Sequence, residues 1–372
     1  MTIKYSGLED IPGLGPKRIK SLKANGYDSI AKVKKARFND LLEVPFLGYK
    51  STYNLKRYLG QGIDYRIMQE ILEDTMTQPL AIENKNIKPW QTTKNNQITK
   101  LQPSDFTLES TTVWSFPNRG DWATHTPEYR GNWSPRVARN IILRYSKKGD
   151  IVLDPMVGGG TTLVEAILTE RNSIGIDVNP RSAMITKNRL NFPKEGEGMS
   201  SEAWSRVFVG DARRMDLLED ESIDLIATHP PYANIIRYGE GIKDDLSTIS
   251  DYDIFAGEMK KAAEEMYRVL KPGGYCAILM GDTHNKSHYV PIAFKVMTKY
   301  LETGFILKED VIKHEWNCWS DPKWKNKAND RFLLTMHEHL FIFRKLSKSE
   351  KVSDFRNSSL SLFRGASEQR PV

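Results

Sequence analysis

A glycine-rich segment lies between two short apolar runs, and each run leads to an aspartate. The first run ends at Asp154, Gly158 to Gly160 follow, and the second run, residues 174–176, leads to Asp177. This pattern predicts a strand, a loop, a helix and a strand whose tips form one ligand-binding edge. The glycines allow a ligand close to the backbone, and the helix start offers free N–H groups. Asp177 stands where an acid can accept hydrogen bonds from both hydroxyls of a ribose.

A second segment, His229-Pro230-Pro231-Tyr232, follows an apolar run of residues 223–228 that predicts another strand. The two prolines fix the backbone and remove two N–H donors, so carbonyl groups there can accept from an incoming group. The ring of Tyr232 can stack on a planar base. A Pro-Pro-Tyr tripeptide also occurs in ordinary loops, but its position at a strand tip favours a catalytic role.

Both segments resemble motifs of the S-adenosylmethionine-dependent amino-methyltransferases of DNA. The loop DPMVGGGTT lacks the G-x-G-x-x-G spacing of dinucleotide sites and is similar to the family's D-P-F-x-G-S-G-T-T. Met156 replaces the aromatic residue of that motif, and Gly159 replaces its serine. The second segment resembles the (Asp/Asn/Ser)-Pro-Pro-Tyr motif of enzymes that methylate exocyclic amino nitrogens. A glycine-rich turn in some other α/β domain is the alternative for the loop alone.

The resemblance implies S-adenosyl-L-methionine as the cofactor and assigns residues to it. Ser134 and Pro135 have the residue types of an N-cap and a first helical position, and in the family the start of such a helix binds the methionine end. Asp211 follows the apolar residues 206–209 and matches the acid that accepts from the adenine amino group, although an ordinary loop aspartate is the alternative. The implied cofactor-binding residues are Trp133, Ser134, Pro135, Asp154, Pro155, Met156, Gly158, Gly160, Thr161, Thr162, Asp177, Asp211 and Ala212.

The chemistry of amino methylation explains the catalytic candidates His229, Pro230, Pro231 and Tyr232. The amino lone pair of adenine or cytosine is delocalised into the ring and is a poor nucleophile. Hydrogen bonds from the amino group to the Pro230 carbonyl and to side chain 229 would draw the nitrogen towards tetrahedral geometry, and proximity would supply much of the remaining acceleration. A duplex base must be flipped out to reach such a pocket, where Tyr232 would stack on it.

His229 departs from the family pattern. Neutral imidazole can accept one hydrogen bond, whereas imidazolium cannot. In the family, Asp or Asn at this position usually goes with adenine N6, and Ser goes with either base. The run Thr228-His229-Pro-Pro-Tyr is slightly closer to the T-S-P-P-Y of cytosine-N4 enzymes, so the expected target is cytosine N4 or adenine N6, with a slight preference for cytosine. A packing role for His229 is the alternative.

The remaining pattern predicts the elements that position these residues. Strands are expected at residues 151–154, 174–176, 206–209, 223–228, 275–280, 305–312 and 339–343, with the last strand antiparallel. Helices are expected from Ser134, after Gly160, and at residues 179–190 and 251–270, and a turn is expected at residues 271–274. The fold class is therefore α/β: a Rossmann-like class I methyltransferase domain at residues 111–345, with a seven-stranded, mostly parallel sheet.

The N-terminal segment, residues 1–60, contains an internal repeat. Residues 8–26 and 41–60 match at an offset of 33, each with the pattern of a short helix, a tight turn and an amphipathic helix. They resemble a tandem helix-hairpin-helix domain, which binds DNA without reading its sequence, and Phe46 stands where the first glycine of the second hairpin is expected. The resemblance implies DNA contacts from Gly13, Gly15, Lys17, Gly48 and Lys50. A helical protein–protein module is the alternative.

The charge distribution favours DNA as the partner of this segment. The net charge is +7, and residues 1–60 hold twelve Lys/Arg against five Asp/Glu, so the remaining 312 residues are balanced. A basic module joined to a neutral body indicates a polyanionic partner. Trp316 and Trp319 lie among lysines in a second candidate DNA-binding segment, although packing of these tryptophans against the core is an equal alternative.

The rest of the chain adds few functional signals. Residues 61–110 are expected to form a connector with a helix at 63–72, and residues 346–372 a flexible, serine-rich tail. Two cysteines make neither a disulfide framework nor a metal site, and no apolar stretch approaches membrane-span length. We therefore expect a cytoplasmic protein with no metal and no membrane partner, and a cognate restriction endonuclease is a candidate partner.

Three functions compete at this point. The first is methylation of an exocyclic amino nitrogen in DNA. The second is methylation of RNA, because tRNA guanine-N2 enzymes carry a related motif, and protein-glutamine methylation has the same motif-based support. The third is a non-catalytic DNA-binding protein on a relic methyltransferase fold, which the unusual His229 permits. The tandem hairpins favour DNA over the second.

Overall fold

The computed structural model describes residues 6–12, 14–36, 40–41, 43–47, 51–52, 55–56, 59, 80–82, 85–87, 98, 100–192, 195–196, 199–200, 202–216, 218–236, 238, 242, 244–286, 288–316 and 333–360. Gly13, Gly48, Lys50 and Trp319, which were predicted to bind DNA, lie outside these ranges. The helix predicted at residues 63–72 lies outside them as well.

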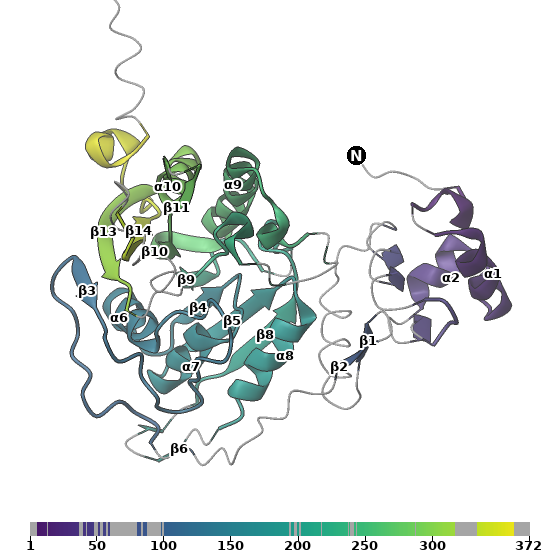
Figure 1. Ribbon diagram of the computed structural model, residues 1–372, viewed down its shortest axis with the longest axis horizontal. Helices are drawn as coiled ribbons and strands as arrows, with labels where there is room; N and C mark the ends of the chain where they lie inside the picture. Colours follow the sequence, from purple (N-terminus) through teal and green to yellow (C-terminus); the bar gives the residue numbers. More distant parts are fainter. Residues whose placement is uncertain are drawn as a thin grey trace, which may run out of the picture.

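An eight-stranded mixed sheet in the order β3-β13-β14-β10-β9-β4-β5-β8 forms the centre of the catalytic region (Figure 1). Its strands are β3 (Val113–Ser115), β4 (Ile151–Asp154), β5 (Asn172–Asp177), β8 (Ser205–Val209), β9 (Ile223–Thr228), β10 (Leu270–Met280), β13 (Ile306–His314) and β14 (His337–Arg344). All neighbours pair in parallel except β14, which runs antiparallel to both β10 and β13. This arrangement confirms the predicted Rossmann-like, mostly parallel sheet with an antiparallel last strand.

The sheet differs from the prediction in two places. It has one strand more than the seven expected, because the three residues of β3 pair in parallel with the end of β13. The turn expected at residues 271–274 is instead an irregularity inside β10, since Leu270 pairs with Ile223 and the next paired residue is Tyr275, opposite Leu225. A three-residue edge strand and a strand bulge both lack the longer alternation on which a sequence-based assignment depends.

Helices cover both faces of the sheet. On one side lie α6 (Pro135–Tyr145), α7 (Thr161–Leu168) and α8 (Pro180–Arg189), and on the other α9 (Tyr252–Val269) and α10 (Ile292–Glu302) (Figure 1). Cys276 and Ile278 of β10 are buried in the cluster that contains α9 and α10, whereas Ala277 and Leu279 are buried in the cluster that contains α6. Both faces of the central strands are therefore buried, as expected for a parallel sheet between helical layers.

The helices begin where the sequence predicts. Ser134 caps α6 through a hydrogen bond from the Arg136 N–H, with Pro135 at the first position. Asp251 caps α9 by accepting from the N–H groups of Asp253 and Ile254. The buried residues of α9 recur at helical spacing and are Phe255, Ala256, Met259, Ala262, Ala263, Met266 and Val269.

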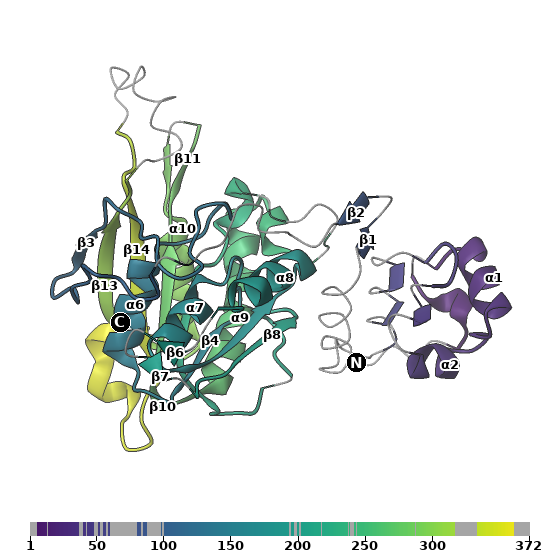
Figure 2. The same cartoon turned by 90° about the horizontal axis from the view of Figure 1, so that it is seen from below.

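The N-terminal module, defined here as the described part of residues 1–60, has its own apolar cluster. It contains the 3₁₀ helix η1 (Leu8–Asp10), α1 (Pro16–Ala24) and α2 (Ile30–Lys35), drawn in purple at the right of Figure 2. The buried residues are Leu8, Ile11, Leu14, Leu22, Val33, Leu41, Val44, Leu47, Leu55 and Leu59. Three leucines of the first repeat, Leu8, Leu14 and Leu22, and their counterparts 33 residues later all belong to this cluster. Equivalent leucines of the two sequence repeats are therefore buried in the same apolar cluster.

The segments before and after residues 111–345 also contact this region or form short helices and strands. The Gln102 amide donates to the Leu168 carbonyl at 2.8 Å, and the Glu109 N–H donates to Asn140 Oδ1 at 2.8 Å. At the C-terminal side, Glu350 pairs with Arg344 at 2.7 Å ahead of the 3₁₀ helix η5 (Val352–Ser358). Three small two-stranded sheets are formed by β1 (Leu80–Ile82) with β2 (Lys85–Ile87), β6 (Glu195–Gly196) with β7 (Met199–Ser200), and β11 (Thr283–Asn285) with β12 (His288–Val290).

Within the described part of the chain, no helix combines the length and the apolar composition that crossing a membrane requires.

Candidate active site

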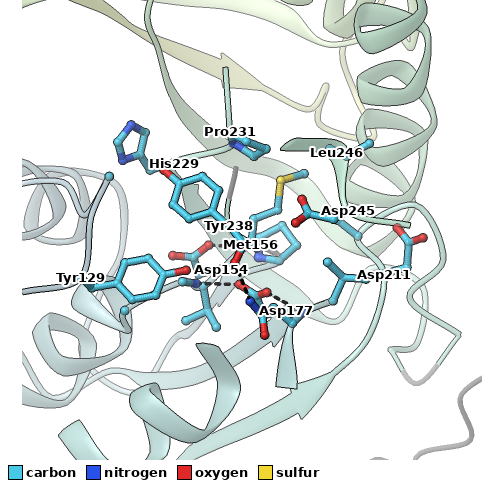
Figure 3. A pocket seen from close by; sticks show the side chains of 18 of the residues that line it. Tyr129, Asp154, Met156, Asp177, Asp211, His229, Pro231, Tyr238, Asp245 and Leu246 are labelled. Atoms are coloured by element: carbon cyan, nitrogen blue, oxygen red, sulfur yellow. Dashed lines mark hydrogen bonds between the residues drawn. The ribbon is translucent and has the colours of Figure 1, made fainter. Parts of the chain in front are cut away.

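A cavity lies at the carboxyl ends of β4, β5, β8 and β9. In a parallel sheet these ends lie at the same edge. The strand order reverses at β4, because β5 lies on one side of it and β9 on the other, and ligands commonly bind at such a switch point. The lining residues are Tyr129, Gly131, Asn132, Trp133, Asp154, Pro155, Met156, Val157, Gly158, Gly159, Asp177, Val178, Asn179, Gly210, Asp211, Ala212, His229, Pro231, Tyr238, Asp244, Asp245 and Leu246. Figure 3 draws most of their side chains and labels Asp154, Asp177 and His229 among them.

Asp154, at the end of β4, connects the glycine loop to the strand that carries His229. Its carboxylate accepts hydrogen bonds from the Thr162 hydroxyl at 2.5 Å, the Thr228 hydroxyl at 2.6 Å and the Met156 N–H at 3.2 Å. Burial raises the pKa of Asp154 to about 6, and these three donors oppose the rise. Because Thr228 directly precedes His229, Asp154 fixes the relative position of the two sequence motifs.

Asp177, at the end of β5, faces the cavity. Its two oxygens accept from the Gly158 N–H at 2.9 Å and the Asn179 N–H at 2.8 Å. Burial raises the pKa of Asp177 to about 7, the two N–H groups oppose this, and the charges of Asp245 and Asp154 add to it. A carboxylate held in this way retains lone pairs that can accept from the hydroxyls of a bound ribose.

The other acids of the cavity differ in how their charge is balanced. Asp211 forms an ion pair with Arg213 at 2.7 Å, and Arg213 also contacts Glu258 and Asp244. Asp245 accepts from the Ser247 N–H at 2.8 Å with one oxygen, while its second oxygen, Oδ2, is buried and has no hydrogen-bond partner among the described residues. No Lys or Arg occurs among the described residues that line the cavity. An acidic cavity with an unsatisfied carboxylate oxygen fits a ligand that carries positive charge and N–H or O–H donors.

The glycine loop holds the backbone against this cavity. Gly160 caps α7 with φ +82°, and a Cβ atom there would lie 2.8–3.1 Å from Thr186. A residue with a side chain would therefore meet both a left-handed backbone and a clash. The next two residues, Thr161 and Thr162, donate to Asn132 and Asp154. Hydrogen bonds to two different segments therefore hold the end of the loop in place.

A larger cleft adjoins the cavity. Gly131, Asn132, Trp133, His229 and Tyr238 line both spaces, so they form the wall between them. Within the motif, Pro231 lines the cavity, whereas Pro230 and Tyr232 line the cleft. The His-Pro-Pro-Tyr segment therefore stands at the junction of the two spaces.

His229 is held tightly at this junction. Its ring stacks on Trp133 with centroids 5.8 Å apart and planes 23° apart, and its Nε2 lies 2.5 Å from the Tyr232 hydroxyl. Burial lowers the pKa of His229 to about 4, although the charge of Glu338 opposes this. The imidazole is therefore neutral at physiological pH, as the expected acceptor role requires.

Tyr232 is held by a strand that is remote in sequence. Its hydroxyl donates to Glu338 Oε1 of β14 at 2.6 Å, and Lys313 of β13 approaches the other Glu338 oxygen at 2.7 Å. The ring fits against Gly281, where a Cβ atom would lie 2.5 Å from Tyr232 Cε2. Position 281 therefore has to be glycine for the tyrosine to occupy this place.

The predicted cofactor residues fall into two groups. Trp133, Asp154, Pro155, Met156, Gly158, Asp177, Asp211 and Ala212 line the cavity. Gly160, Thr161, Thr162 and Pro135 do not line it, and Ser134 lines the cleft instead, where it also donates to the Arg119 carbonyl at 2.8 Å. These five belong to helix starts, caps or hydrogen bonds around the cavity, while the first group faces it.

The predicted DNA-binding residues that are described occupy exposed positions. Trp316 is 48% exposed, lines the cleft and donates through its indole N–H to the Ser115 hydroxyl at 3.0 Å. Gly15 caps α1, and Lys17 is exposed in the first turn of that helix.

Several site residues had no signal in the sequence analysis. Tyr129 and Tyr238 stack with centroids 6.0 Å apart, and both line the cavity. Asp245, Glu338 and Lys313 come from segments outside the two motifs. The only available signal was position, since residues 238–246 follow the His-Pro-Pro-Tyr segment, and loops after strand tips commonly complete such sites.

The fold and the site together define a Rossmann-like, S-adenosylmethionine-dependent methyltransferase. The chain belongs to the N6/N4 DNA methylase family: the sequence model of that family, described as DNA methylase, matches residues 20–188 and 223–362. A second model, described as an RMKL-like methyltransferase domain, matches residues 128–271. The cofactor of the family is S-adenosylmethionine, and its ribose hydroxyls, amino groups and sulfonium charge fit the acids of the cavity.

Individual relatives are similar over parts of their length. The type II methyltransferase M.MjaI of Methanocaldococcus jannaschii is 27% identical over 175 residues, which is 38% of this chain and 55% of that protein. The tRNA (guanine(10)-N2)-dimethyltransferase of Methanothermobacter thermautotrophicus is 37% identical over 105 residues, 28% of this chain and 29% of that protein. The chain thus spans about half or less of the length of these curated relatives. Among solved structures, a SAM-dependent methyltransferase from Methanosarcina mazei covers 56% of this chain and 98% of its own, with 14% identity and a TM-score of 0.40.

Proposed function

We propose that the protein transfers a methyl group from S-adenosylmethionine to an exocyclic amino nitrogen of a base in DNA. The target is cytosine N4 or adenine N6, with a slight preference for cytosine N4 from the Thr-His-Pro-Pro-Tyr sequence. The observation that carries the proposal is the place of His229 in the wall shared by the cavity and the cleft. A group bound in the cleft would there meet a methyl donor bound in the cavity.

The residues at the junction suit the activation of an amino group. S-adenosylmethionine supplies an electrophilic methyl group when it is bound. The Pro230 carbonyl and the neutral His229 ring each accept one hydrogen bond, so together they take both N–H groups of the amine. Such bonds favour a tetrahedral nitrogen with a localised lone pair, and they strengthen as that geometry develops. Tyr232, at the cleft side, offers a ring face to the base.

The size and lining of the cleft support a nucleic-acid substrate. The cleft is larger than the cavity, and exposed Trp316 stands at its wall. A flipped base would enter it at an energetic cost of a few kcal/mol. We assign sequence-independent DNA binding to the N-terminal module, because its basic surplus and its repeated buried leucines fit a tandem helix-hairpin-helix domain. A cognate restriction endonuclease as partner is part of the same proposal.

RNA is the second candidate substrate. The observation that favours it is the 37% identity, over 105 residues, to a tRNA (guanine(10)-N2)-dimethyltransferase. The family match and the N-terminal repeat favour DNA.

The deciding experiment supplies methyl-labelled cofactor to the full-length protein with unmethylated genomic DNA or with unmodified tRNA. The products are digested to nucleosides and identified by mass spectrometry. We expect N4-methylcytosine or N6-methyladenine from the DNA arm, and His229→Ala, which should still bind the cofactor, serves as the control for contaminating activity. Label in tRNA guanine would favour the second candidate, and no label in either polymer would contradict both.

A further inference from the structure

Four side chains form a continuous relay from β13 and β14 to the catalytic motif. Lys313 Nζ lies 2.7 Å from Glu338 Oε2, Glu338 Oε1 lies 2.6 Å from the Tyr232 hydroxyl, and that hydroxyl lies 2.5 Å from His229 Nε2. The side chain of Glu338 is only 7% exposed. These contacts bring a buried ion pair against a histidine that must be neutral to act as an acceptor.

The position of each proton in the relay follows from the charge of Glu338. Burial opposes ionisation of this carboxyl, but the nearby Lys313 and His229 and the Tyr232 hydroxyl hold its pKa below the ordinary value. An ionised carboxylate can only accept. The Tyr232 hydroxyl therefore donates its single proton to Glu338, and its oxygen is left to accept from His229 Nε2–H.

The relay consequently fixes the tautomer of His229. A neutral imidazole carries one proton, so with Nε2 protonated the lone pair is on Nδ1. Nδ1 is buried and has no hydrogen-bond partner among the described residues. The Gly131 backbone raises the pKa of the ring, as a carbonyl facing a ring N–H does, so it competes with the relay for the proton at Nδ1, although no hydrogen bond is formed there. Both His229 and Gly131 line the cavity and the cleft.

We propose that Glu338 is a positioning residue that acts through Tyr232 to fix His229 as the Nε2–H tautomer, leaving Nδ1 to accept from the target amino group. This rests on the proposed function for the identity of the donor. Asp, Asn or Ser at position 229 would present an oxygen without needing such control, whereas histidine presents an acceptor on only one of two nitrogens.

The first test reads the tautomer without any reaction. Full-length protein labelled with ¹⁵N-histidine is examined by long-range ¹H–¹⁵N correlation spectroscopy, and the His229 signals are identified by their loss in His229→Asn. We expect a protonated Nε2 and an unprotonated Nδ1 at neutral pH. In Glu338→Gln the amide can donate or accept, so the fixed assignment should be lost and Nδ1–H should become populated. A wild-type protein with Nδ1–H facing Gly131 would overturn the proposal.

The second test measures turnover in a double-mutant cycle. We expect Glu338→Gln to lower kcat by about tenfold, the effect of one lost hydrogen bond, with little change in KM for the polymer. The same change in the His229→Asn background should lower kcat less than about twofold, because the amide does not depend on the relay. Glu309→Gln removes a carboxylate from the adjacent strand outside the relay and serves as the matched control.

The outcomes of the second test separate the relay from the proposed function. Equal losses in both backgrounds would mean that Glu338 acts through packing alone, and the proposal would be wrong. A wild-type protein that methylates neither DNA nor tRNA would instead contradict the proposed function, while the tautomer would still be decided by spectroscopy.

Discussion

At the residue scale, the acidic side chains around the cavity differ in the groups that stabilise their negative charge. Asp154 is buried among hydroxyl donors, Asp177 among backbone N–H groups, and Asp211 is neutralised by Arg213. Asp245 has one oxygen without a partner. S-adenosylmethionine and its product S-adenosylhomocysteine share the ribose, but only the former carries a sulfonium charge. Asp177 and Asp245 should therefore respond differently to the two ligands.

We predict that Asp177→Ala weakens binding of both ligands by about 1–3 kcal/mol, because the ribose loses a charged acceptor in each. Asp245→Asn keeps the shape of the side chain and removes its charge, so it should weaken S-adenosylmethionine more than S-adenosylhomocysteine. Isothermal titration calorimetry of both variants with both ligands measures the two effects. An unchanged affinity in folded Asp177→Ala would contradict the ribose assignment.

The depressed pKa of His229 leads to a second prediction at this scale. The acceptor form is the neutral ring, so turnover should be lost only as the pH falls through about 4, and not near the ordinary histidine value of about 6.5. His229→Asn has no titrating ring and should lack this acid limb while it retains activity. His229→Ala should lose more in turnover than in DNA binding, because the hydrogen bond matters most as the nitrogen becomes tetrahedral.

The stability of the fold has to be followed in the same experiment. The pKa of His229 is lower in the folded than in the unfolded chain, so the unfolded state takes up the proton first as the pH falls. Its contribution to stability is complete above about pH 6.5 and is lost progressively down to about pH 4. Turnover is therefore corrected for the folded fraction by circular dichroism. An acid limb that is identical in wild type and His229→Asn would assign it to another group.

The sequence predicted those site residues that belong to a motif at the end of a strand. Asp154, Asp177 and His229 stand at strand tips, so the pattern that predicts the strands also predicts that they meet. Glu338 could not be found in this way, because it is 106 residues from Tyr232 and their contact depends on the register of β14 against β10 and β13. Long-range strand register is not encoded in a local pattern.

At the scale of elements, the second repeat of the N-terminal module contains a conformational outlier. Phe46, at the position equivalent to Gly13, has φ +69° and is 70% exposed. Its carbonyl accepts from Arg18 Nε of the first repeat at 3.1 Å. A bulky residue in the left-handed region is strained by about 1–2 kcal/mol, and glycine is free of this strain. An exposed ring therefore occupies a place that the local backbone favours for glycine.

We predict that Phe46→Gly stabilises the N-terminal module by about 0.5–1 kcal/mol, the relieved strain less the greater entropy of the unfolded glycine chain. Amide hydrogen exchange of the buried leucines in this module measures the change. We also expect weaker DNA binding, because strain retained at an exposed position is often associated with function. Slower exchange with unchanged DNA affinity would leave the ring without a role in binding, and unchanged exchange would show that the turn is unstrained.

The elements themselves were largely predictable, for reasons that vary from one to another. The spans of β4 and β9 match the prediction, because long apolar runs with polar ends leave little choice of boundary. β3 was missed because three residues have no recognisable period, and its pairing depends on β13, which lies almost 200 positions later in the chain. The bulge at residues 271–274 was read as a turn because Pro-Gly-Gly is typical of both.

At the scale of the whole molecule, the positive charge is concentrated at one end of the sequence. The whole net charge of +7 resides in residues 1–60, while the other 312 residues are balanced. In α1, Lys17 and Lys20 are exposed, whereas Lys23 pairs with Glu9 at 2.8 Å. If the module positions the enzyme on the phosphate backbone, these two lysines should set the salt dependence of binding while the base pocket sets the sequence preference.

We therefore predict that the double change Lys17→Gln, Lys20→Gln in the full chain lowers DNA affinity and reduces the slope of log K against log salt by about 1–2, since each phosphate contact contributes about 0.9. The matched control is Lys348→Gln, Lys351→Gln, which removes the same charge from exposed positions near the C-terminal end of the described chain. Fluorescence anisotropy with duplex DNA across a salt series gives both slopes. The preferred methylation site should be the same in all three proteins, because phosphate contacts carry no sequence information. Equal slopes for the α1 variant and its control would show that net charge alone matters and that the module serves another partner.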